Sequence, residues 1–249
     1  MITGLRRSAL YVPCDTEKMI VKAAGCMADV LMLNLEDGVS ALRKDAARAN
    51  AVQALKSLDF GAREIVVRIN SLESEAGQAD MESIVACRPD GICLPKVETP
   101  MAILAAGRMI SELEVRCGLP EGGVKLLAMI ESAAGVLGIR EIASASPRMA
   151  SVVFGSADYS EDVRCLPGED RSEFLLALQM IVAGARTAGV DAIDAPCFQI
   201  RNKVQAELSE AENRGRALST LEGNLIDNPH RSAAERILRR VQLARRYAR

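Results

Sequence analysis

Short apolar runs that close on polar or charged residues recur along the whole chain. They are continuous rather than alternating, which is typical of parallel strands that are covered on both faces. Their starts are separated by roughly 20–40 residues, about what one strand and one crossover helix require. The runs begin near Ser8, Val30, Glu64, Gly91, Val124, Ser151, Val190 and Leu221. The pattern therefore predicts eight parallel strands.

Helical patterns fill the stretches between these runs. Residues 16–27 follow Asp15, a suitable N-cap, and residues 100–117 begin with proline and stop at Gly118. Further helices are expected at 40–58, 173–188, 200–218 and 232–247. Eight strands alternating with helices fit the 249 residues with no linker left over. We therefore predict one α/β domain over residues 1–249, a single (β/α)₈ TIM barrel without an evident C-terminal lid extension.

The composition narrows the possible partners. With 31 basic and 33 acidic side chains the formal charge is −2, and aromatic residues make up 3% with no Trp. A nucleic-acid partner would require a basic stripe and stacking aromatics, so none is expected. No apolar run approaches the roughly 18 residues that span a bilayer, which predicts no membrane partner. The seven cysteines contain no CxxC pair, which favours a reducing, cytoplasmic location.

Two carboxylates stand where apolar runs end. Glu131 follows LLAMI and Asp158 follows VVFGSA, 27 positions later, which is about one βα unit. A parallel barrel gathers the carboxyl ends of its strands on one face, so the two side chains would lie side by side. Two hard oxygen ligands with open positions suit Mg²⁺. The alternative is that each carboxylate only caps the helix that follows it.

Arg68 lies inside the apolar run IVVRIN. A charged residue in such a run is costly unless it is paired. Its planar guanidinium could hold a substrate carboxylate or stabilise a developing enolate oxygen. Alternatively it forms a structural ion pair with Glu36 or Asp37 at the neighbouring strand end, and the two interpretations are compatible. Glu36 and Asp37 could also orient metal-bound water or favour a helix N-terminus through its dipole.

Other strand ends carry further candidates. Lys96, after Pro95, is interpreted either as a Schiff-base lysine or as a charge partner for Glu36 or Glu98. Asp194 could hydrogen-bond a substrate or cap a helix. His230, which is the only histidine, could act as a general base or as a cap. The backbone N–H groups of Gly155, Ser156 and Ala157 could bind a carboxylate at a helix start.

In order and spacing, a set of short strings resembles the citrate lyase beta-subunit-like family, which includes malyl-CoA, citramalyl-CoA and citryl-CoA lyases. The strings are RSALYVP (7–13), LNLEDGV (33–39), KDAAR (44–48), VRIN (67–70), LPKVE (94–98), MIESAAGV (129–136), FGSADY (154–159) and AIDAP (192–196). No single string is specific, and the resemblance covers most of the chain.

The resemblance implies a (β/α)₈ lyase that acts on a carbon–carbon bond between a thioester and a 2-oxo acid. It implies that Glu131 and Asp158 hold Mg²⁺ and that Arg68 contacts the oxo acid, with Glu36 and Asp37 beside it in the catalytic set. The expected partners are a 2-oxo acid and an acyl-CoA thioester. A homo-oligomer, a trimer or hexamer, is suggested by the likeness alone. The expected substrate-binding residues are Arg68, Pro95, Lys96, Gly155, Ser156, Ala157 and Asp194.

The chain departs from the family pattern in three places. Asn34 stands where relatives commonly carry an aspartate, and we interpret this change as structural. The last strand reads EGNLIDNPH (222–230) rather than the usual lysine-containing motif, so contacts near CoA are expected to differ. No counterpart of the family's C-terminal lid, which carries an acidic catalytic residue, is visible before Arg249.

Two rival functions remain open at this point. The first is a metal-dependent aldolase that acts on free hydroxy acids without CoA. That branch relies on a histidine early in the barrel, whereas the histidine here is at position 230. The second is a non-catalytic or partner-dependent subunit that binds an oxo acid.

Overall fold

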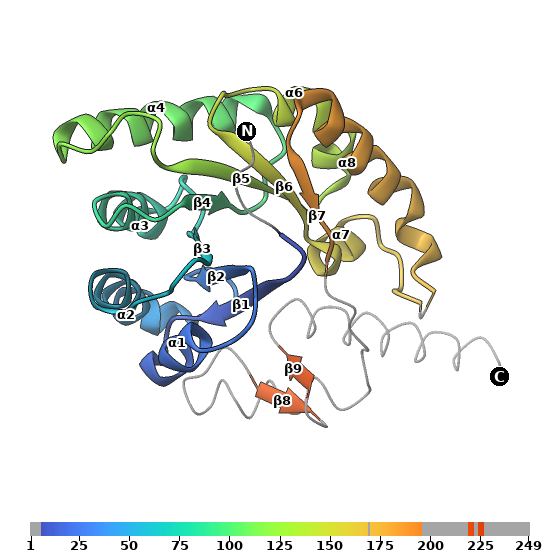
Figure 1. Ribbon diagram of the computed structural model, residues 1–249. Coiled ribbons are helices and arrows are strands. Elements are labelled where there is room, and N and C mark those ends of the chain that lie inside the picture. The colour runs from blue at the N-terminus through green and yellow to red at the C-terminus, as the bar shows by residue number, and fades with distance from the viewer. Residues whose placement is uncertain (1–5, 169, 196–218, 222–223, 227–249) are drawn as a thin grey trace.

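Seven parallel strands form one sheet in which each strand pairs with the next one in the chain (Figure 1). The computed structural model describes residues 6–168, 170–195, 219–221 and 224–226. Because all seven strands are parallel, residues far apart in sequence share the edge at which the strands end. The strands are β1 (Ala9–Pro13), β2 (Val30–Asn34), β3 (Glu64–Arg68), β4 (Gly91–Leu94), β5 (Lys125–Ile130), β6 (Met149–Phe154) and β7 (Asp191–Ile193).

Helices connect the strands and cover the outer face of the curled sheet (Figure 1). Pro100 opens the fourth helix, and Gly189, with a φ of 69°, ends the eighth, as the sequence predicts. The helices are α1 (Glu17–Ala24), α2 (Lys44–Ser57), α3 (Glu75–Val85), α4 (Pro100–Arg116), α5 (Ala133–Leu137), α6 (Ile139–Ala143), α7 (Ser156–Asp162) and α8 (Leu175–Ala188), with 3₁₀ turns η1 (Ala41–Arg43) and η2 (Ser172–Phe174).

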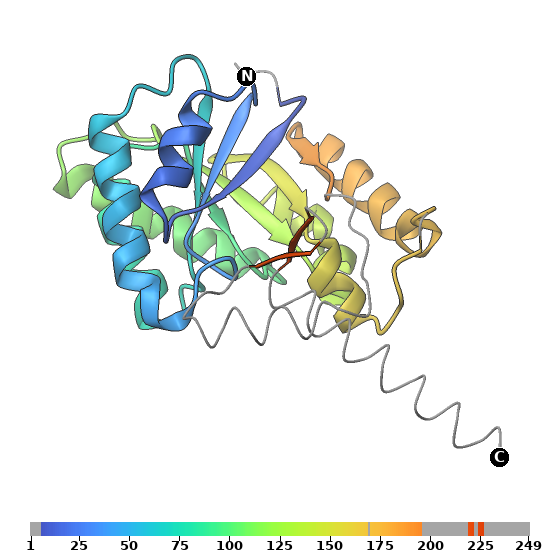
Figure 2. The ribbon, with the colours of Figure 1, turned by 90° about the horizontal axis from the view of Figure 1, so that it is seen from below.

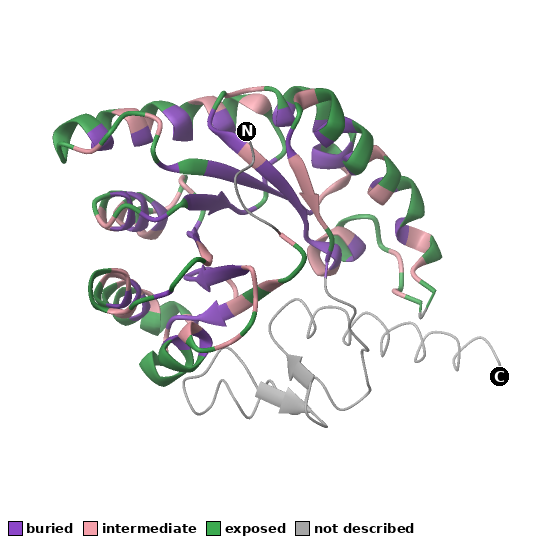
Figure 3. Cartoon of the chain, in the orientation of Figure 1, coloured by how far each residue is buried: buried purple, intermediate pink, exposed green. Residues whose placement is uncertain are grey.

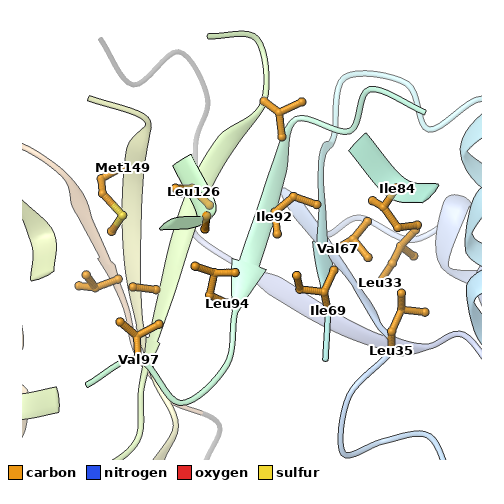
Figure 4. Packing of buried hydrophobic residues seen from close by; sticks show 14 of the residues in the cluster. Leu33, Leu35, Val67, Ile69, Ile84, Ile92, Leu94, Val97, Leu126 and Met149 are labelled. Carbon is orange, nitrogen blue, oxygen red and sulfur yellow. The ribbon is translucent and has the colours of Figure 1, made fainter. Parts of the chain in front are cut away.

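The sheet is buried on both faces (Figure 3). Alternate strand residues, such as Leu33 and Val67, point outward and pack against the helices in one large cluster (Figure 4). Their neighbours point into the curl and form a second cluster that contains strand residues only: Val30, Met32, Val66, Cys93, Leu127, Met129 and Val153. Burial on both faces explains why the sequence shows continuous apolar runs instead of alternation.

The run near Leu221 does not supply the eighth parallel strand that the sequence predicts there. Strand β8 (Ser219–Leu221) pairs antiparallel with β9 (Asn224–Ile226) in a separate two-stranded sheet. These strands are short and carry Ser, Thr and Asn, so they lack the apolar content of a strand that is buried on both faces. The helices expected at 200–218 and 232–247, and the segment with His230, lie outside the described residues.

No helix in the described ranges is both long and apolar enough to cross a bilayer.

Arg6, just before β1, contacts residues of β3, β6 and β7. The Arg6 Nε and Nη2 atoms each lie 2.6 Å from a carboxylate oxygen of Glu64 in β3. Its Nη1 atom donates to Asp191 Oδ2 in β7 at 3.0 Å and to the Ala150 carbonyl in β6 at 3.1 Å. Because β1 and β7 are the two edge strands, the sheet must curl until both starts lie within reach of one side chain (Figures 1 and 2).

We expect Arg6→Ala to destabilise the fold by about 2 kcal/mol, because it leaves two partly buried carboxylates without their cation. The Arg6 side chain is only 10% exposed. The neighbouring Arg7→Ala is the control, since the Arg7 side chain is 72% exposed and pairs with Asp29 at the surface. Urea unfolding of both variants measures the difference. Equal losses would contradict a special role for Arg6.

Candidate active site

The polar residues that the sequence places after apolar runs meet at the carboxyl edge of the sheet. Parallel register brings these strand ends together. The chain supplies them as Glu36 and Asp37 after β2, Arg68 at the end of β3, Lys96 after β4, Glu131 after β5 and Asp158 in the first turn of α7.

Arg68 is buried and holds a network of contacts. Its Nη2 atom lies 3.1 Å from Glu36 Oε2, and its Nε donates to Asn34 Oδ1 at 2.7 Å. Its Nη1 donates to Met129 Sδ at 3.4 Å. Burial works to lower the pKa of Arg68, but the surrounding groups, Glu36 first and Glu131 among them, together outweigh it and raise that pKa, so the guanidinium stays charged. The predicted ion pair is therefore present, and its partner is Glu36.

The sequence predicts that the change to Asn34 is structural, and the structure places Asn34 in this network. Its Oδ1 accepts from Arg68 Nε and from the backbone N of Glu36 at 3.1 Å. A neutral acceptor orients the guanidinium without adding a second negative charge. Strand alternation offers a signal that could have found it, because Asn34 lies two positions before Glu36 and next to Arg68 in the register.

Glu36 and Asp37 form one acidic group with Lys96. The Lys96 Nζ lies 3.8 Å from Glu36 Oε1 and 3.8 Å from Asp37 Oδ2. Burial raises the pKa of Glu36 despite the nearby Arg68. Burial alone would lower the pKa of Lys96, but Asp37 and Glu36 raise it overall. A Schiff-base lysine needs a depressed pKa, so the structure favours the charge-partner interpretation of Lys96.

The loop that carries Glu36 is fixed by hydrogen bonds from residues that sequence patterns did not single out. Lys44 Nζ donates to the carbonyls of Leu35 and Glu36, both at 2.8 Å. Asn70 Nδ2 donates to the Leu35 carbonyl at 3.1 Å and to the buried Asp80 carboxylate at 2.6 Å. These bonds fix the backbone on which the acidic pair is placed. Lys44 and Asn70 stand in the KDAAR and VRIN strings, and that is the only sequence signal.

Glu131 and Asp158 lie side by side, as predicted, and their carboxyl groups hydrogen-bond each other. Glu131 is 4% exposed, and its Oε1 accepts from the backbone N of Lys96 at 2.7 Å. Burial and the adjacent Asp158 carboxylate raise the pKa of Glu131 well above its usual value. Burial also raises the pKa of Asp158. Ser132, not Glu131, caps α5 by accepting from Gly135 N, which removes the capping interpretation for Glu131.

This acidic pair fits a hard divalent cation. Two buried carboxylates in contact must share a proton or bind a cation between them, because both cannot stay ionised alone. No cluster of three or more His, Cys, Asp or Glu ligands occurs among the residues that the structure describes. The remaining ligands would come from water and substrate, as is usual for Mg²⁺. Glu131 and Asp158 are therefore the residues that could hold the metal.

Gly155 leaves the space that Glu131 occupies. A Cβ at Gly155 would lie 2.5 Å from Glu131 Oε2 and 2.7 Å from Glu131 Cβ. Its backbone N donates to the Ile130 carbonyl at 2.9 Å. Ser156 and Ala157 follow at the start of α7, beside the acidic pair, which is where the sequence predicts that a substrate carboxylate binds.

Two other predicted site residues have different surroundings. Asp194 accepts from both Nη atoms of Arg171 at 2.7 and 2.9 Å, an ion pair that lowers the pKa of Asp194. Pro95 is buried after β4 and sets the chain direction into Lys96. His230 lies outside the described residues.

A family model described as HpcH/HpaI aldolase/citrate lyase matches residues 7–219. The chain belongs to this family. The resemblance drawn from the short strings is thereby confirmed.

Several named relatives support this membership. The citrate lyase subunit beta of Leuconostoc mesenteroides subsp. cremoris is 38% identical over 190 residues, which cover 76% of this chain and 63% of that protein. The mitochondrial citramalyl-CoA lyase of Rattus norvegicus is 32% identical, with coverages of 80% and 61%. The chain thus spans less than two thirds of either relative. A (3S)-malyl-CoA thioesterase of Cereibacter sphaeroides is 27% identical, with coverages of 95% and 94%.

A solved structure shares the fold. CitE of Mycobacterium tuberculosis, in complex with magnesium, acetoacetate and coenzyme A, superposes with a TM-score of 0.61 at 24% identity. The match covers 95% of this chain and 99% of that one. At this identity the likeness establishes a common fold.

We expect Gly155→Ala to abolish divalent-cation binding while the fold is kept, because the added methyl group displaces the Glu131 carboxylate. Gly25→Ala is the matched control, since a Cβ there meets nothing closer than 3.7 Å. Titration with Mn²⁺ followed by electron paramagnetic resonance measures binding, and circular dichroism checks the fold. Wild-type affinity in Gly155→Ala would show that Glu131 is not a ligand.

Tyr11 provides a second test of the site's interior. Its ring lies under the Arg68 guanidinium, 5.4 Å from ring centroid to Cζ, yet its buried hydroxyl has no hydrogen-bond partner within the described part of the chain. We expect Tyr11→Phe to raise the free energy of unfolding by about 1 kcal/mol, because it removes an unsatisfied buried group and keeps the cation–π contact. Thermal unfolding checks this, and a loss of stability would reveal a partner for the hydroxyl.

Proposed function

We propose that this protein is a Mg²⁺-dependent carbon–carbon lyase. It would cleave a 3-hydroxyacyl-CoA of the citramalyl-, malyl- or citryl-CoA type into acetyl-CoA and a 2-oxo acid. The observation that carries the proposal is the buried Glu131–Asp158 pair on the same sheet edge as the permanently charged Arg68. Family membership and the lyase names of two relatives support it. A fold neighbour crystallised with magnesium supports the choice of metal.

Glu131 and Asp158 would hold Mg²⁺, which, when bound, polarises the carbonyl or hydroxyl oxygen of an α-oxo or α-hydroxy carboxylate. Arg68 supplies the fixed positive charge that this carboxylate needs. Asn34 and Glu36 orient the guanidinium, so its direction is set before the substrate arrives. Neutralisation by Glu36 alone leaves the guanidinium free to bind a second anion.

In cleavage, the substrate hydroxyl gives its proton to a carboxylate. Asp37 is the better placed acceptor, because Glu36 is committed to Arg68 whereas Asp37 is not. The electron pair of the carbon–carbon bond then moves toward the thioester, and the hydroxyl carbon becomes the carbonyl carbon of the oxo acid. The resulting enolate takes up a proton to give acetyl-CoA. Asp37 and Glu36 are thus assigned to catalysis, and Pro95, Lys96, Gly155, Ser156 and Ala157 to the substrate-binding wall.

The proposal extends to the assembly. We infer a single domain of the (β/α)₈ barrel type, whose eighth strand would come from outside residues 219–226, working as a cytoplasmic homo-oligomer, a trimer or hexamer. Fold neighbours of the citrate lyase type and the Arg6 contact between the sheet's ends support the closed barrel.

A partner-dependent role is the second candidate, because one relative carries the name of a subunit. It predicts oxo-acid binding without turnover by the isolated chain. Thioester hydrolysis, suggested by the name of another relative, would release CoA without an oxo acid.

The test is a panel of thioesters and free acids assayed with Mg²⁺ and again with EDTA. The panel holds the two citramalyl-CoA isomers, malyl-CoA, citryl-CoA, citramalate and malate. Released pyruvate, glyoxylate or oxaloacetate is measured beside acetyl-CoA. EDTA-sensitive cleavage of one thioester would support the lyase and name its substrate. Cleavage of free acids alone would support the aldolase, and CoA release without an oxo acid would support a thioesterase.

We expect Glu131→Gln and Asp158→Asn to lower kcat by at least about 100-fold, since each removes one of two charged metal ligands. The fold should persist, because each substitution keeps the shape of the side chain and removes a repulsive charge. Mn²⁺ titration should show a parallel loss of affinity. Full turnover in either variant would refute the metal assignment.

A further inference from the structure

We propose that Lys96 is a catalytic residue whose ammonium group holds the thioester oxygen while that oxygen carries the enolate charge. This inference rests on the proposed lyase function and deepens it, because it assigns the group that stabilises the acetyl-CoA half of the substrate. It goes beyond the substrate contact expected for Lys96 by giving that contact a chemical task.

The backbone conformation of Lys96 is strained. Lys96 has a φ of 51°, in the left-handed region that non-glycine residues rarely adopt. Glycine would adopt this conformation without that strain. The turn points the backbone N–H of Lys96 at Glu131 Oε1, 2.7 Å away. Any residue could supply this N–H, and glycine would do so with least strain. The presence of lysine at this position therefore has to be explained by its side chain and not by its backbone.

The ammonium group of Lys96 lies near two carboxylates without hydrogen-bonding to them. Lys96 Nζ lies 3.8 Å from the nearest oxygens of Glu36 and Asp37, which attracts it but is too far for a hydrogen bond. Within the described ranges, its three N–H donors are therefore not committed to an acceptor. The side chain is 55% exposed, so the group faces the open side of the site.

The other cations at this edge are already engaged. Arg68 uses one N–H donor each on Glu36, Asn34 and Met129, is buried inside the curl, and is assigned to the oxo-acid carboxylate in the proposed function. Lys44 spends two of its donors on backbone carbonyls, at 2.8 Å each. Among the described cations of the site, Lys96 is the one with both a free set of donors and solvent access. A large acyl-CoA must approach from that side.

During cleavage, negative charge moves to the acetyl-CoA half of the substrate. When the carbon–carbon bond breaks, its electron pair forms the double bond between the two carbons of the acetyl group, and the thioester oxygen gains the negative charge. The hydroxyl proton has gone to a carboxylate, and a proton returned to the methylene carbon restores neutrality. A cationic donor aimed at the thioester oxygen lowers the energy of this intermediate. With its Nζ 3.8 Å from both Glu36 and Asp37, the Lys96 side chain is pre-positioned for that task.

The test uses Lys96→Gly and Lys96→Arg in the full chain. Lys96→Gly keeps the N–H that binds Glu131 and removes the backbone strain. We expect its kcat to fall about 100-fold while Mg²⁺-dependent pyruvate binding, measured by calorimetry, stays within about twofold. Exchange of the acetyl-CoA methyl protons into D₂O, followed by NMR, should fall in parallel. Lys96→Arg should recover at least about tenfold of the loss.

Arg88→Gly is the matched control. Arg88 is an exposed basic residue with nearly the same conformation, a φ of 56°, after α3 and away from the site. Its substitution relieves the same strain, so both glycine variants should be at least as stable as the wild type. Only Lys96→Gly should lose turnover.

Three results would overturn the proposal. A kcat of Lys96→Gly within about threefold of wild type would remove the catalytic role. Equal losses of pyruvate binding, stability and turnover would reduce Lys96 to a structural partner of Glu36 and Asp37. A wild type that neither cleaves a thioester nor exchanges acetyl-CoA protons would refute both proposals, whereas proton exchange without cleavage would refute the lyase alone and leave Lys96 supported.

Discussion

Concentrated negative charge at one edge of a sheet is the constraint around which this site is built. Four carboxylates follow the three strands β2, β5 and β6: Glu36 and Glu131 are buried, and Asp37 and Asp158 are partly buried. Such a group is stable only if cations accompany it or protons are retained. Arg68 forms an ion pair with Glu36 inside the curl, and Lys96 lies close to Glu36 and Asp37 on the open side. The Glu131–Asp158 pair keeps a proton or accepts a metal.

The positioning of these charges relies on neutral hydrogen bonds as much as on ion pairs. Asn34 and the backbone N–H of Lys96 aim Arg68 and Glu131, respectively, without changing the net charge. Gly77 allows α3 to approach closely, since a Cβ there would lie 2.0 Å from the Ser71 carbonyl. That approach carries Asp80 to Asn70 and so supports the loop after β2. In the proposed function, fixed dipoles and close spacing would let the site bind an anion in spite of its own acidity.

How far the sequence predicts this fold and its site depends on whether a feature is local. Strands and their polar ends follow from apolar runs, so the amino-acid sequence alone singles out Arg68, Glu131 and Asp158. Asn34 and Lys44 act through contacts with residues 34 and 8–9 positions away; strand alternation hints at the role of Asn34, whereas no periodic pattern reveals the contacts of Lys44. The error at Leu221 has the same origin, because a short run containing Ser and Thr does not determine whether its partner is parallel or antiparallel.

The contact between Arg6 and Asp191 joins residues 185 positions apart. A polypeptide leaving the ribosome presents Arg6 first, and its acceptor in β7 follows only after β2 to β6 have been made. Arg6, beside the first strand, therefore lacks its Asp191 partner while β2 to β6 are added to the sheet. Long-range contacts of this kind form late, so the closure between Arg6 and β7 is expected to be the last part of the sheet to become ordered during synthesis and the most exposed to cellular chaperones.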